Sequence, residues 1–271
     1  MAAEFGPLVT GDWLAAHLSE VRVVDVRWYL RERSGHAEYR AGHICGALWL
    51  DIDTDLSAPA TTADGRHPMP SAAAFAAALG RVGIADGQPV VAYDDAGGSH
   101  AARLWWLLHV LGDPVAVLDG GLAAWPRELS TEVPSFARVR RTVRPWPVER
   151  FVEADAVPAA AAVLDARTAE RYLHGDPATD PRPGHIPGAR SAPWAGNLDA
   201  ATGRFLDSAT LRDRFEALGA AGGNVVAYCG SGVTACHTLL ALEVAGISDT
   251  ALYPGSWSQW GADPRRQAET S

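Results

Sequence analysis

One stretch of the chain reads Val225-Val226-Ala227-Tyr228-Cys229-Gly230-Ser231-Gly232-Val233-Thr234-Ala235-Cys236. An apolar run typical of a buried strand leads into a turn that contains two glycines, and a helical pattern follows. This order predicts a loop whose backbone N–H groups curl toward the sulfur of Cys229, with the positive end of a helix behind them. Both features stabilise negative charge on sulfur, so the stretch predicts a reactive cysteine after a strand.

The alternatives for Cys229 are a small buried core residue and the nucleophile of a phosphatase. A core cysteine requires neither Gly230 nor Gly232 beside it, and glycine at an ordinary strand-to-helix junction has an entropic cost. A cysteine-dependent phosphatase has an arginine as the sixth residue after its cysteine, and this chain has Ala235 there. The guanidinium that would hold phosphate is therefore missing.

Short segments of the first half of the chain recur in the same order in the second half. The pairs are Val24–Arg27 with Leu164–Arg167, Gly42–Ala47 with Gly184–Ala189, Val90–Tyr93 with Val225–Tyr228, and Leu118–Trp125 with Tyr253–Trp260. Such a long period indicates a duplicated domain, because solenoid repeats are roughly 20 to 50 residues long. We expect an N-terminal domain at 1–127, a linker at 128–150 and a C-terminal catalytic domain at 151–271. Asp94 follows Tyr93 in the first copy, so that copy lacks the thiol and is expected to be non-catalytic.

Strands and helices are expected to alternate within each copy. Runs too apolar to be half exposed predict strands at 21–26, 90–93, 161–165 and 225–228. Helices are predicted at 71–79 and 211–218, with Ser71 and Thr210 as their caps. This alternation predicts an α/β fold in which each domain has a parallel sheet flanked by helices.

Composition narrows the class of protein further. Hydrophobic residues make up 48% of the 271 residues and charged ones 20%, as in a globular protein. We find no apolar stretch as long as a membrane span and no signal-peptide pattern, and a net charge of −9 disfavours nucleic acid and anionic membranes as partners. The three cysteines, Cys45, Cys229 and Cys236, form no metal-binding pattern. We therefore expect no metal, no cofactor and a reducing, cytoplasmic location.

Several other polar residues are interpreted as structural. His43 and His185 occur in the same Gly-His-Ile-x-Gly-Ala turn of both copies, and Arg27 and Arg167 also recur. Because one copy has no reaction to serve, we expect these arginines to pair with carboxylates inside each domain. A group of linker arginines is interpreted as a solvated face; its members are Arg138, Arg140, Arg141 and Arg144.

The loop that begins at Cys229 resembles that of the two-domain rhodanese sulfurtransferases, most of all the 3-mercaptopyruvate sulfurtransferases, and the flanking elements match over most of the chain. The resemblance implies the rhodanese-like fold twice. It also implies a persulfide on Cys229, loaded by a small-molecule donor and unloaded by a thiol acceptor such as thioredoxin, or by cyanide. The loop residues expected at the substrate are Gly230, Gly232, Val233 and Thr234. The Thr234 hydroxyl is equally a candidate for capping the helix.

The donor decides whether a proton is needed. When thiosulfate is the donor, the leaving group is sulfite, which needs no proton. When 3-mercaptopyruvate is the donor, the leaving group is an enolate carbon, which must be protonated. The resemblance to the mercaptopyruvate enzymes implies a relay of Ser231 in the loop with His67 and Asp53 of the first domain. From the residues alone, Asp53 could equally cap a turn and His67 could be a solvated loop residue.

Arginine suits the donor's carboxylate because it can grip two oxygens at once. The resemblance implies this role for Arg171 and, with a spacing to Gly184-His185 shorter than in some relatives, for Arg182. We therefore expect a sulfurtransferase that takes sulfur from 3-mercaptopyruvate. A thiosulfate:cyanide sulfurtransferase is the first alternative, which the neutral Gly230 and Ser231 disfavour. A non-catalytic sulfur carrier or redox sensor is the second.

Overall fold

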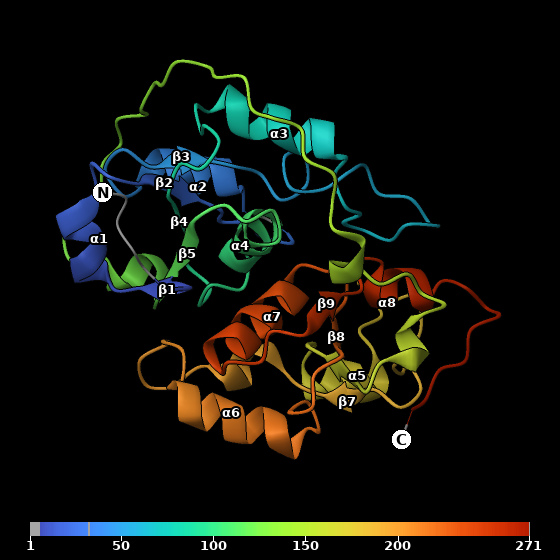
Figure 1. Cartoon of the computed structure of the whole chain (residues 1–271). Helices are drawn as coiled ribbons and strands as arrows, with labels where there is room; N and C mark the ends of the chain where they lie inside the picture. The colour runs from blue at the N-terminus through green and yellow to red at the C-terminus, as the bar shows by residue number, and fades with distance from the viewer. Residues whose placement is uncertain (1–5, 32, 271) are drawn as a thin grey trace. The chain divides into compact units, whose positions relative to one another are not determined.

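The computed structural model describes residues 6–31 and 33–270 and divides the chain into two compact units (Figure 1). Unit 1 contains the chain up to Ala58 together with Pro70–Trp146, and unit 2 contains Pro59–Met69 together with the chain from Pro147 onward. The short segment Pro59–Met69 lies inside the N-terminal domain expected from the sequence, yet it packs with unit 2. No helix within the described ranges is long and apolar enough to cross a membrane.

Unit 1 is built on a five-stranded parallel sheet with the strand order β1-β5-β4-β2-β3. Its elements are β1 (Leu8–Val9), α1 (Gly11–His17), β2 (Arg22–Asp25), α2 (Gly35–Ala41), β3 (Leu48–Trp49), α3 (Ala72–Arg81), β4 (Val90–Tyr93), α4 (Ala101–His109), β5 (Val115–Leu118) and the 3-10 turn η1 (Gly121–Ala124). The predicted strands at 21–26 and 90–93 are confirmed as β2 and β4. Ser71 caps α3 as predicted, because its hydroxyl accepts the N–H of Ala74 at 3.1 Å.

Side chains alternate between the two faces of this sheet. Val23, Val91 and Ala116 point to one face and pack in a buried cluster with Leu14 of α1 and with Ile44. Their neighbours along the strands point to the opposite face, where α4 packs against β4 and β5. The sheet is therefore covered on both sides, which the fully apolar strands predicted.

Unit 2 is built on a four-stranded parallel sheet with the strand order β7-β6-β8-β9. Its elements are η2 (Val148–Arg150), η3 (Val157–Ala159), β6 (Ala162–Asp165), α5 (Ala169–His174), β7 (Arg190–Ser191), η4 (Trp194–Asn197), α6 (Ser208–Ala217), β8 (Val225–Tyr228), α7 (Thr234–Val244), β9 (Thr250–Leu252) and α8 (Ser256–Trp260). The predicted strands at 161–165 and 225–228 are confirmed as β6 and β8. Both units therefore have the predicted α/β architecture.

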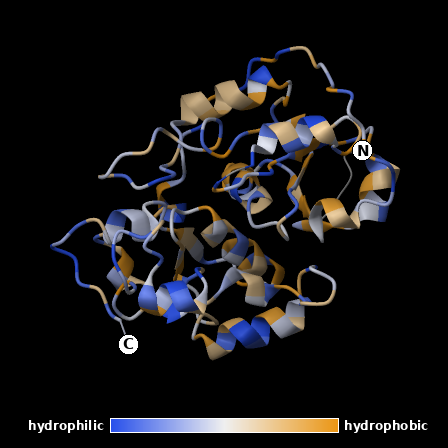
Figure 2. Cartoon of the chain, turned by 180° about the vertical axis from the view of Figure 1, so that it is seen from behind, coloured by the Kyte–Doolittle hydropathy of each residue, from blue (hydrophilic) through white to orange (hydrophobic). Residues whose placement is uncertain are grey.

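The core of unit 2 lies on the two faces of its sheet. Val163, Val226 and Tyr228 form a buried cluster with Trp257, while α7 packs against β8 and β9. Helix α6 packs beside α7 as an outer layer. The hydropathy colours of Figure 2 agree with this placement, because α6 is largely hydrophilic while the strands are hydrophobic.

The start of α6 corrects one prediction. The helix begins at Ser208, and its cap is Asp207, whose Oδ1 accepts the N–H groups of Ala209 and Thr210 at 3.0 Å each. The prediction of Thr210 as the cap is wrong, because Thr210 already lies in the first turn and donates its own hydroxyl to Asp207.

Each unit repeats a buried ion pair at the end of a strand. An Nη2 of Arg27 lies 2.6 Å from Oδ2 of Asp25, and the corresponding distance between Arg167 and Asp165 is also 2.6 Å. Each guanidinium also donates to the carbonyl of the glycine that begins the repeated Gly-His-Ile turn, at 2.7 and 2.8 Å respectively. The arginine therefore ties the strand to that turn, and the predicted structural role is confirmed.

The two repeated histidines of these turns are buried. Nδ1 of His43 contacts the carbonyl of Tyr39 at 2.8 Å, and Nδ1 of His185 contacts the carbonyl of Tyr172 at 3.1 Å. In both units the ring joins the turn to the helix before it. This matched bonding supports their interpretation as structural residues.

The linker arginines do not form one solvated face. Arg138 and Arg140 are exposed, but the guanidinium of Arg141 is buried in an ion pair with Asp113, which Arg144 also contacts. That interpretation is wrong for Arg141 and Arg144, because the linker up to residue 146 packs on unit 1 and a carboxylate distant in sequence lies beneath it.

Candidate active site

The loop after β8 curls around a sulfur atom. Sγ of Cys229 accepts the backbone N–H of Gly232 at 3.1 Å and that of Ser231 at 3.5 Å. Gly232 has a φ of 80°, and a Cβ placed on it would lie 2.6 Å from the carbonyl oxygen of Pro254. Only glycine adopts this conformation readily and leaves room for that close approach. The structure therefore has the curled, glycine-dependent loop that the sequence predicts.

The beginning of α8 holds the other side of the loop. The N–H groups of Trp257 and Ser258 donate to the carbonyls of Cys229 and Gly230, both at 2.9 Å, and the Cys229 N–H donates to Oγ of Ser256 at 3.1 Å. Because the Gly230 carbonyl is directed toward α8, the Ser231 N–H on the same peptide points the other way, toward the sulfur. This arrangement favours an anionic sulfur atom.

Helix α7 begins immediately after the loop. Its cap is Val233, which makes no side-chain capping bond, and Thr234 is its first residue. Thr234 is therefore not the cap, and its role at the substrate stays a prediction. Cys236 is buried within α7 and its S–H donates to the carbonyl of Gly232 at 3.3 Å, in agreement with a packing role. The positive end of α7 adds to the field that stabilises charge on the Cys229 sulfur.

The corresponding loop of unit 1 holds an anion of its own. Asp94 directly follows β4, and its carboxylate accepts four backbone N–H groups at 2.7 to 2.8 Å, those of Ala96, Gly98, His100 and Ala101. A loop at this position of the fold thus binds a negative group through its backbone. In unit 1 a carboxylate takes the place of the thiol, so this position cannot carry a persulfide.

Ser231 and His67 are in direct contact. Nδ1 of His67 lies 2.7 Å from Oγ of Ser231, and both residues are 7% exposed. Both belong to unit 2, because His67 lies on the segment Pro59–Met69. The alternative of a solvated loop histidine is therefore wrong. A hydroxyl of the cysteine loop bonded to a buried imidazole can carry a proton toward a reacting group.

Two further contacts fix this segment within unit 2. The N–H of Arg66 donates to Oγ of Ser258 at 3.1 Å, and Nε2 of Gln259 donates to the carbonyl of Ala63 at 2.5 Å. Both partners belong to α8, which also holds the cysteine loop. The segment and the loop are thereby attached to the same helix.

Two arginines converge on the loop. A Cβ placed on Gly230 would lie 2.9 Å from an Nη2 atom of Arg171 and equally 2.9 Å from one of Arg66. Burial disfavours the charge of Arg171, but an ion pair with Asp180 outweighs it and raises the pKa of Arg171. Burial lowers the pKa of Arg66, and negative charge on Cys229 acts in the opposite direction. The loop therefore lies in a positive environment although its own side chains are neutral.

Sequence reasoning missed Arg66. It directly precedes His67, which was identified only through the resemblance, and no local pattern places this segment beside a cysteine so far along the chain. The one signal in the sequence was that Arg66 directly precedes His67, a residue that the resemblance implies.

The other two predicted residues have different surroundings. Nη2 of Arg182 donates to the carbonyls of Arg266 at 2.6 Å and Asp263 at 3.4 Å, so the structure directs it toward the C-terminal segment. Asp53 belongs to unit 1, where its Oδ2 accepts the indole N–H of Trp28 at 2.9 Å. The roles of Arg182 and Asp53 at the site stay predictions.

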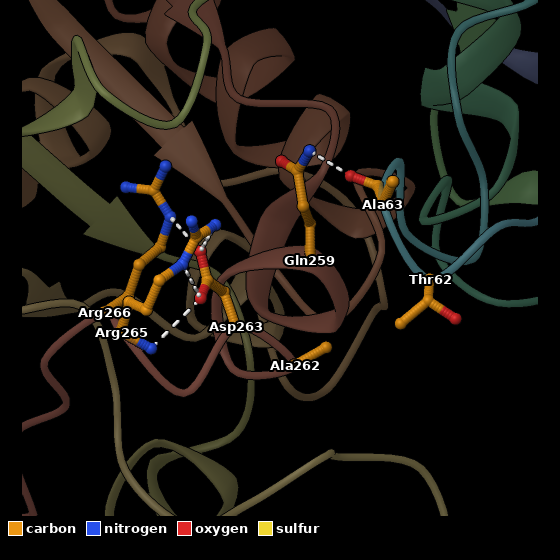
Figure 3. A pocket seen from close by; sticks show the side chains of 7 residues that line it. All are labelled: Thr62, Ala63, Gln259, Ala262, Asp263, Arg265 and Arg266. Atoms are coloured by element: carbon orange, nitrogen blue, oxygen red, sulfur yellow. Dashed lines mark hydrogen bonds and ion pairs between the residues drawn. The ribbon is translucent and has the colours of Figure 1, made fainter.

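A separate cavity of about 430 Å³ lies between α8 and the segment that carries His67 (Figure 3). Its lining residues are Thr62, Ala63, Gln259, Ala262, Asp263, Arg265 and Arg266. Asp263 forms ion pairs with both arginines of this lining, at 2.9 and 3.7 Å. With two arginines and one carboxylate, the lining keeps one net positive charge, and the residues of the cysteine loop are not part of it.

The chain was compared with known proteins. A model of the rhodanese-like domain matches it twice, at residues 10–128 and 150–263. A probable 3-mercaptopyruvate sulfurtransferase from Pseudomonas aeruginosa is 43% identical over 282 residues, covering 97% of this chain and 98% of the relative. A putative thiosulfate sulfurtransferase from Mycobacterium tuberculosis is 37% identical over 279 residues, covering 98% of both chains.

A solved structure of a 3-mercaptopyruvate sulfurtransferase from Escherichia coli has a TM-score of 0.80 and 30% identity, and the alignment covers 93% of this chain and 99% of that one. These matches extend along nearly the whole chain and include both units. The predicted family and the tandem rhodanese-like fold are therefore confirmed. The chain belongs to the rhodanese family and is a sulfurtransferase.

Proposed function

We propose that this enzyme takes the thiol sulfur of 3-mercaptopyruvate and carries it as the sulfane sulfur of a persulfide on Cys229. The observation that carries the proposal is the 2.7 Å contact between His67 Nδ1 and Ser231 Oγ, both buried at the cysteine loop. A donor that leaves as sulfite would not use a proton path, whereas one that leaves as an enolate would. The contact therefore favours mercaptopyruvate.

The first half-reaction transfers one sulfur atom. The Cys229 thiolate attacks the thiol sulfur of mercaptopyruvate, an S–S bond forms, and the bond between that sulfur and carbon breaks. The carbon leaves with the bonding electrons as the enolate of pyruvate and takes up one proton. The N–H groups of Ser231 and Gly232, which already point at the sulfur, stabilise its negative charge.

The proton reaches the enolate through the loop. Ser231 donates its hydroxyl proton to the leaving carbon, and His67 restores it through Nδ1. In this proposal Asp53 orients the imidazole, a role that comes from the resemblance. Arg171 holds the donor's carboxylate beside Gly230, and Gly232, Val233 and Thr234 form the rest of the binding loop.

The second half-reaction returns the cysteine to its starting state. A thiol such as thioredoxin, or cyanide, attacks the outer sulfur of the persulfide, and the S–S bond breaks to release the Cys229 thiolate. The three cysteines are free thiols, which suits the reducing cytoplasm as the location of the enzyme.

Thiosulfate is the second candidate donor, and two observations favour it. One relative, 37% identical, is described as a putative thiosulfate sulfurtransferase. In addition, the guanidinium groups of Arg66 and Arg171 beside Gly230 suit a dianion. Because these two guanidinium groups place positive charge beside the loop, the lack of charged side chains within the loop no longer argues against thiosulfate. The proton path is therefore the main feature that distinguishes the two donors.

The test compares both donors in the wild type and in His67→Ala. We expect kcat/KM for mercaptopyruvate to fall by roughly 10²- to 10⁴-fold, the usual worth of general-acid assistance, and that for thiosulfate to fall much less. His174→Ala, which removes an exposed histidine of α5, serves as the matched control and should change neither value. Equal losses with both donors would assign His67 a positioning role and remove the main support for mercaptopyruvate.

A further inference from the structure

Unit 1 has a cavity of its own, with a volume of about 350 Å³, beside the edge strand β3. Its lining comes from α2, β3, the end of α3 and the linker, and all of these belong to unit 1. Cavities that bind small molecules usually have volumes of about 300 to 1,000 Å³. This cavity lies at the lower end of that range and therefore suits a small ligand.

The linker forms one wall of the cavity, and contacts at both ends fix it there. Ser130 exchanges two backbone hydrogen bonds with His43, at 2.7 and 2.9 Å. Further along, the guanidinium of Arg22 lies over the ring of Phe136, with its Cζ 4.1 Å from the ring centroid. Between these two points the chain passes along the cavity, with Pro134 in the lining. Because unit 1 itself holds both ends of this wall, the cavity is formed without a ligand.

Rings enter the lining from three parts of the chain. His36 and Tyr39 belong to α2, Trp49 belongs to β3, and Phe136 belongs to the linker. The rings of His36 and Trp49 lie 4.8 Å apart between centroids, and Tyr39 is buried. Aromatic rings held by their neighbours offer flat faces on which a planar molecule can stack. The lining therefore favours a planar ligand.

The charged side chains of the lining are all cationic. They are Arg81 and Arg138, and the lining contains no aspartate or glutamate, although the whole chain has 32 acidic and 23 basic residues. Arg81 is paired with Asp55 at 2.6 Å. Arg138 is exposed and forms no ion pair with any residue that the structure describes. A guanidinium in this state can bind a carboxylate through two parallel hydrogen bonds.

We propose that this cavity is a binding site for a small planar carboxylate, with its ring against Trp49 and its carboxylate on Arg138. The rings select the shape of the ligand, the volume limits its size, and the cationic lining selects its charge. Unit 1 has Asp94 where unit 2 has Cys229, so it cannot carry a persulfide at that position. Binding of a small carboxylate would give unit 1 a function separate from sulfur transfer.

The experiment uses a photoreactive probe of this class, 4-benzoylbenzoate, and its neutral analogue 4-benzoylbenzamide. On illumination the ketone of either probe takes a hydrogen atom from a nearby C–H group, and the two carbon radicals then join, so the probe is fixed where it binds. The chain contains no lysine, so trypsin cleaves it only after arginine. Residues 128–138 then form one peptide, which contains the linker wall of the cavity, and mass spectrometry measures its labelling.

Three variants identify the binding site. Arg138→Ala removes the proposed partner of the carboxylate, and its labelled peptide extends to Arg140. Val133→Glu places a negative charge in the lining at a position that is 44% exposed. Arg140→Ala is the matched control, because Arg140 is an exposed arginine of the same linker and is not part of the lining.

We expect saturable labelling of the linker peptide by 4-benzoylbenzoate, about tenfold stronger than by the amide, the lower end of what a charged hydrogen bond contributes. Arg138→Ala should reduce labelling by the carboxylate about tenfold, to the level of the amide. Val133→Glu should reduce it as well, since like charges repel, and Arg140→Ala should leave it unchanged.

Equal labelling by the carboxylate and the amide would overturn the inference, as would unchanged labelling in Arg138→Ala and Val133→Glu. Labelling spread over many peptides, or concentrated on the peptide that contains Cys229, would also contradict a site at this cavity. Both substituted positions are exposed, so the variants should fold, and thermal unfolding checks this. Should Arg138→Ala be destabilised, Arg138→Met keeps the aliphatic stem and gives the same comparison.

Discussion

The substitution Gly230→Ala tests the geometry of the site with a single carbon atom. Gly230 does not have a left-handed φ, so alanine is compatible with its backbone conformation. The new Cβ would lie 2.9 Å from the Nη2 atoms of Arg66 and Arg171, where ordinary contacts begin at 3.4 Å. Both guanidinium groups are the far ends of flexible side chains, so they can withdraw.

The magnitude follows from that displacement. Each guanidinium has to withdraw by about 0.5 Å, the difference between 3.4 and 2.9 Å, which lengthens a hydrogen bond beyond its favourable range. Charged hydrogen bonds contribute about 1.5 to 3 kcal/mol each, and we expect a loss of about 1 to 2 kcal/mol from the weakened pair. This corresponds to a decrease in kcat/KM for the donor of about 5- to 30-fold.

The assay measures kcat/KM with 3-mercaptopyruvate and the thermal unfolding midpoint of each variant. Gly222→Ala is the control, because nothing lies within 4 Å of its added carbon and its φ is also outside the left-handed range. It should retain activity and change stability little. Gly232→Ala, with its φ of 80° and a carbonyl oxygen 2.6 Å away, should instead destabilise the loop. Normal turnover in Gly230→Ala would refute the placement of the two arginines at the donor.

Two further predictions concern the paired loops. Cys229→Ser should abolish sulfur transfer with every donor, since a hydroxyl stays protonated and cannot hold sulfane sulfur. After treatment with the donor, the intact mass should show one added sulfur atom on the wild type and none on the variant. Sulfur carried on Cys236 would contradict the assignment of Cys229. Asp94→Asn should lower the free energy of unfolding by about 3 to 6 kcal/mol, because two of the four N–H groups would face the amide NH2 and lose their acceptor, and each of these charged hydrogen bonds is worth about 1.5 to 3 kcal/mol. Urea unfolding measures this loss, and a change below about 1 kcal/mol would show that the carboxylate is dispensable.

The sequence predicted the parts of the fold that depend on local patterns. The run Val225–Tyr228 is apolar at every position, and the structure shows a central strand covered on both faces. The cap of α6 was misjudged because both Asp207 and Thr210 can accept backbone bonds, and only the backbone path decides between them. The burial of Arg141 was missed because Asp113, its partner, lies on another element.

The same distinction between local and distant residues applies to the candidate active site. The environment of Cys229 follows from its neighbours, since Gly230 and Gly232 lie within three residues of it. The contact of His67 with Ser231 spans 164 residues and could be expected only from the resemblance. Arg66 shares that long separation, and its place beside Gly230 depends on the packing of the segment Pro59–Met69 with unit 2, which no sequence pattern reports.

The segment Pro59–Met69 has a consequence for the modularity of the protein. The chain on either side of this segment belongs to unit 1, but the segment itself packs with unit 2 and contributes Arg66 and His67 to it. A fragment cut at the linker would keep the cysteine loop and lose both of these side chains. The two halves of the chain share repeated sequence segments, but the second half lacks Arg66 and His67 when it is expressed alone. Any transfer of the cysteine domain to another protein therefore has to include the segment Pro59–Met69.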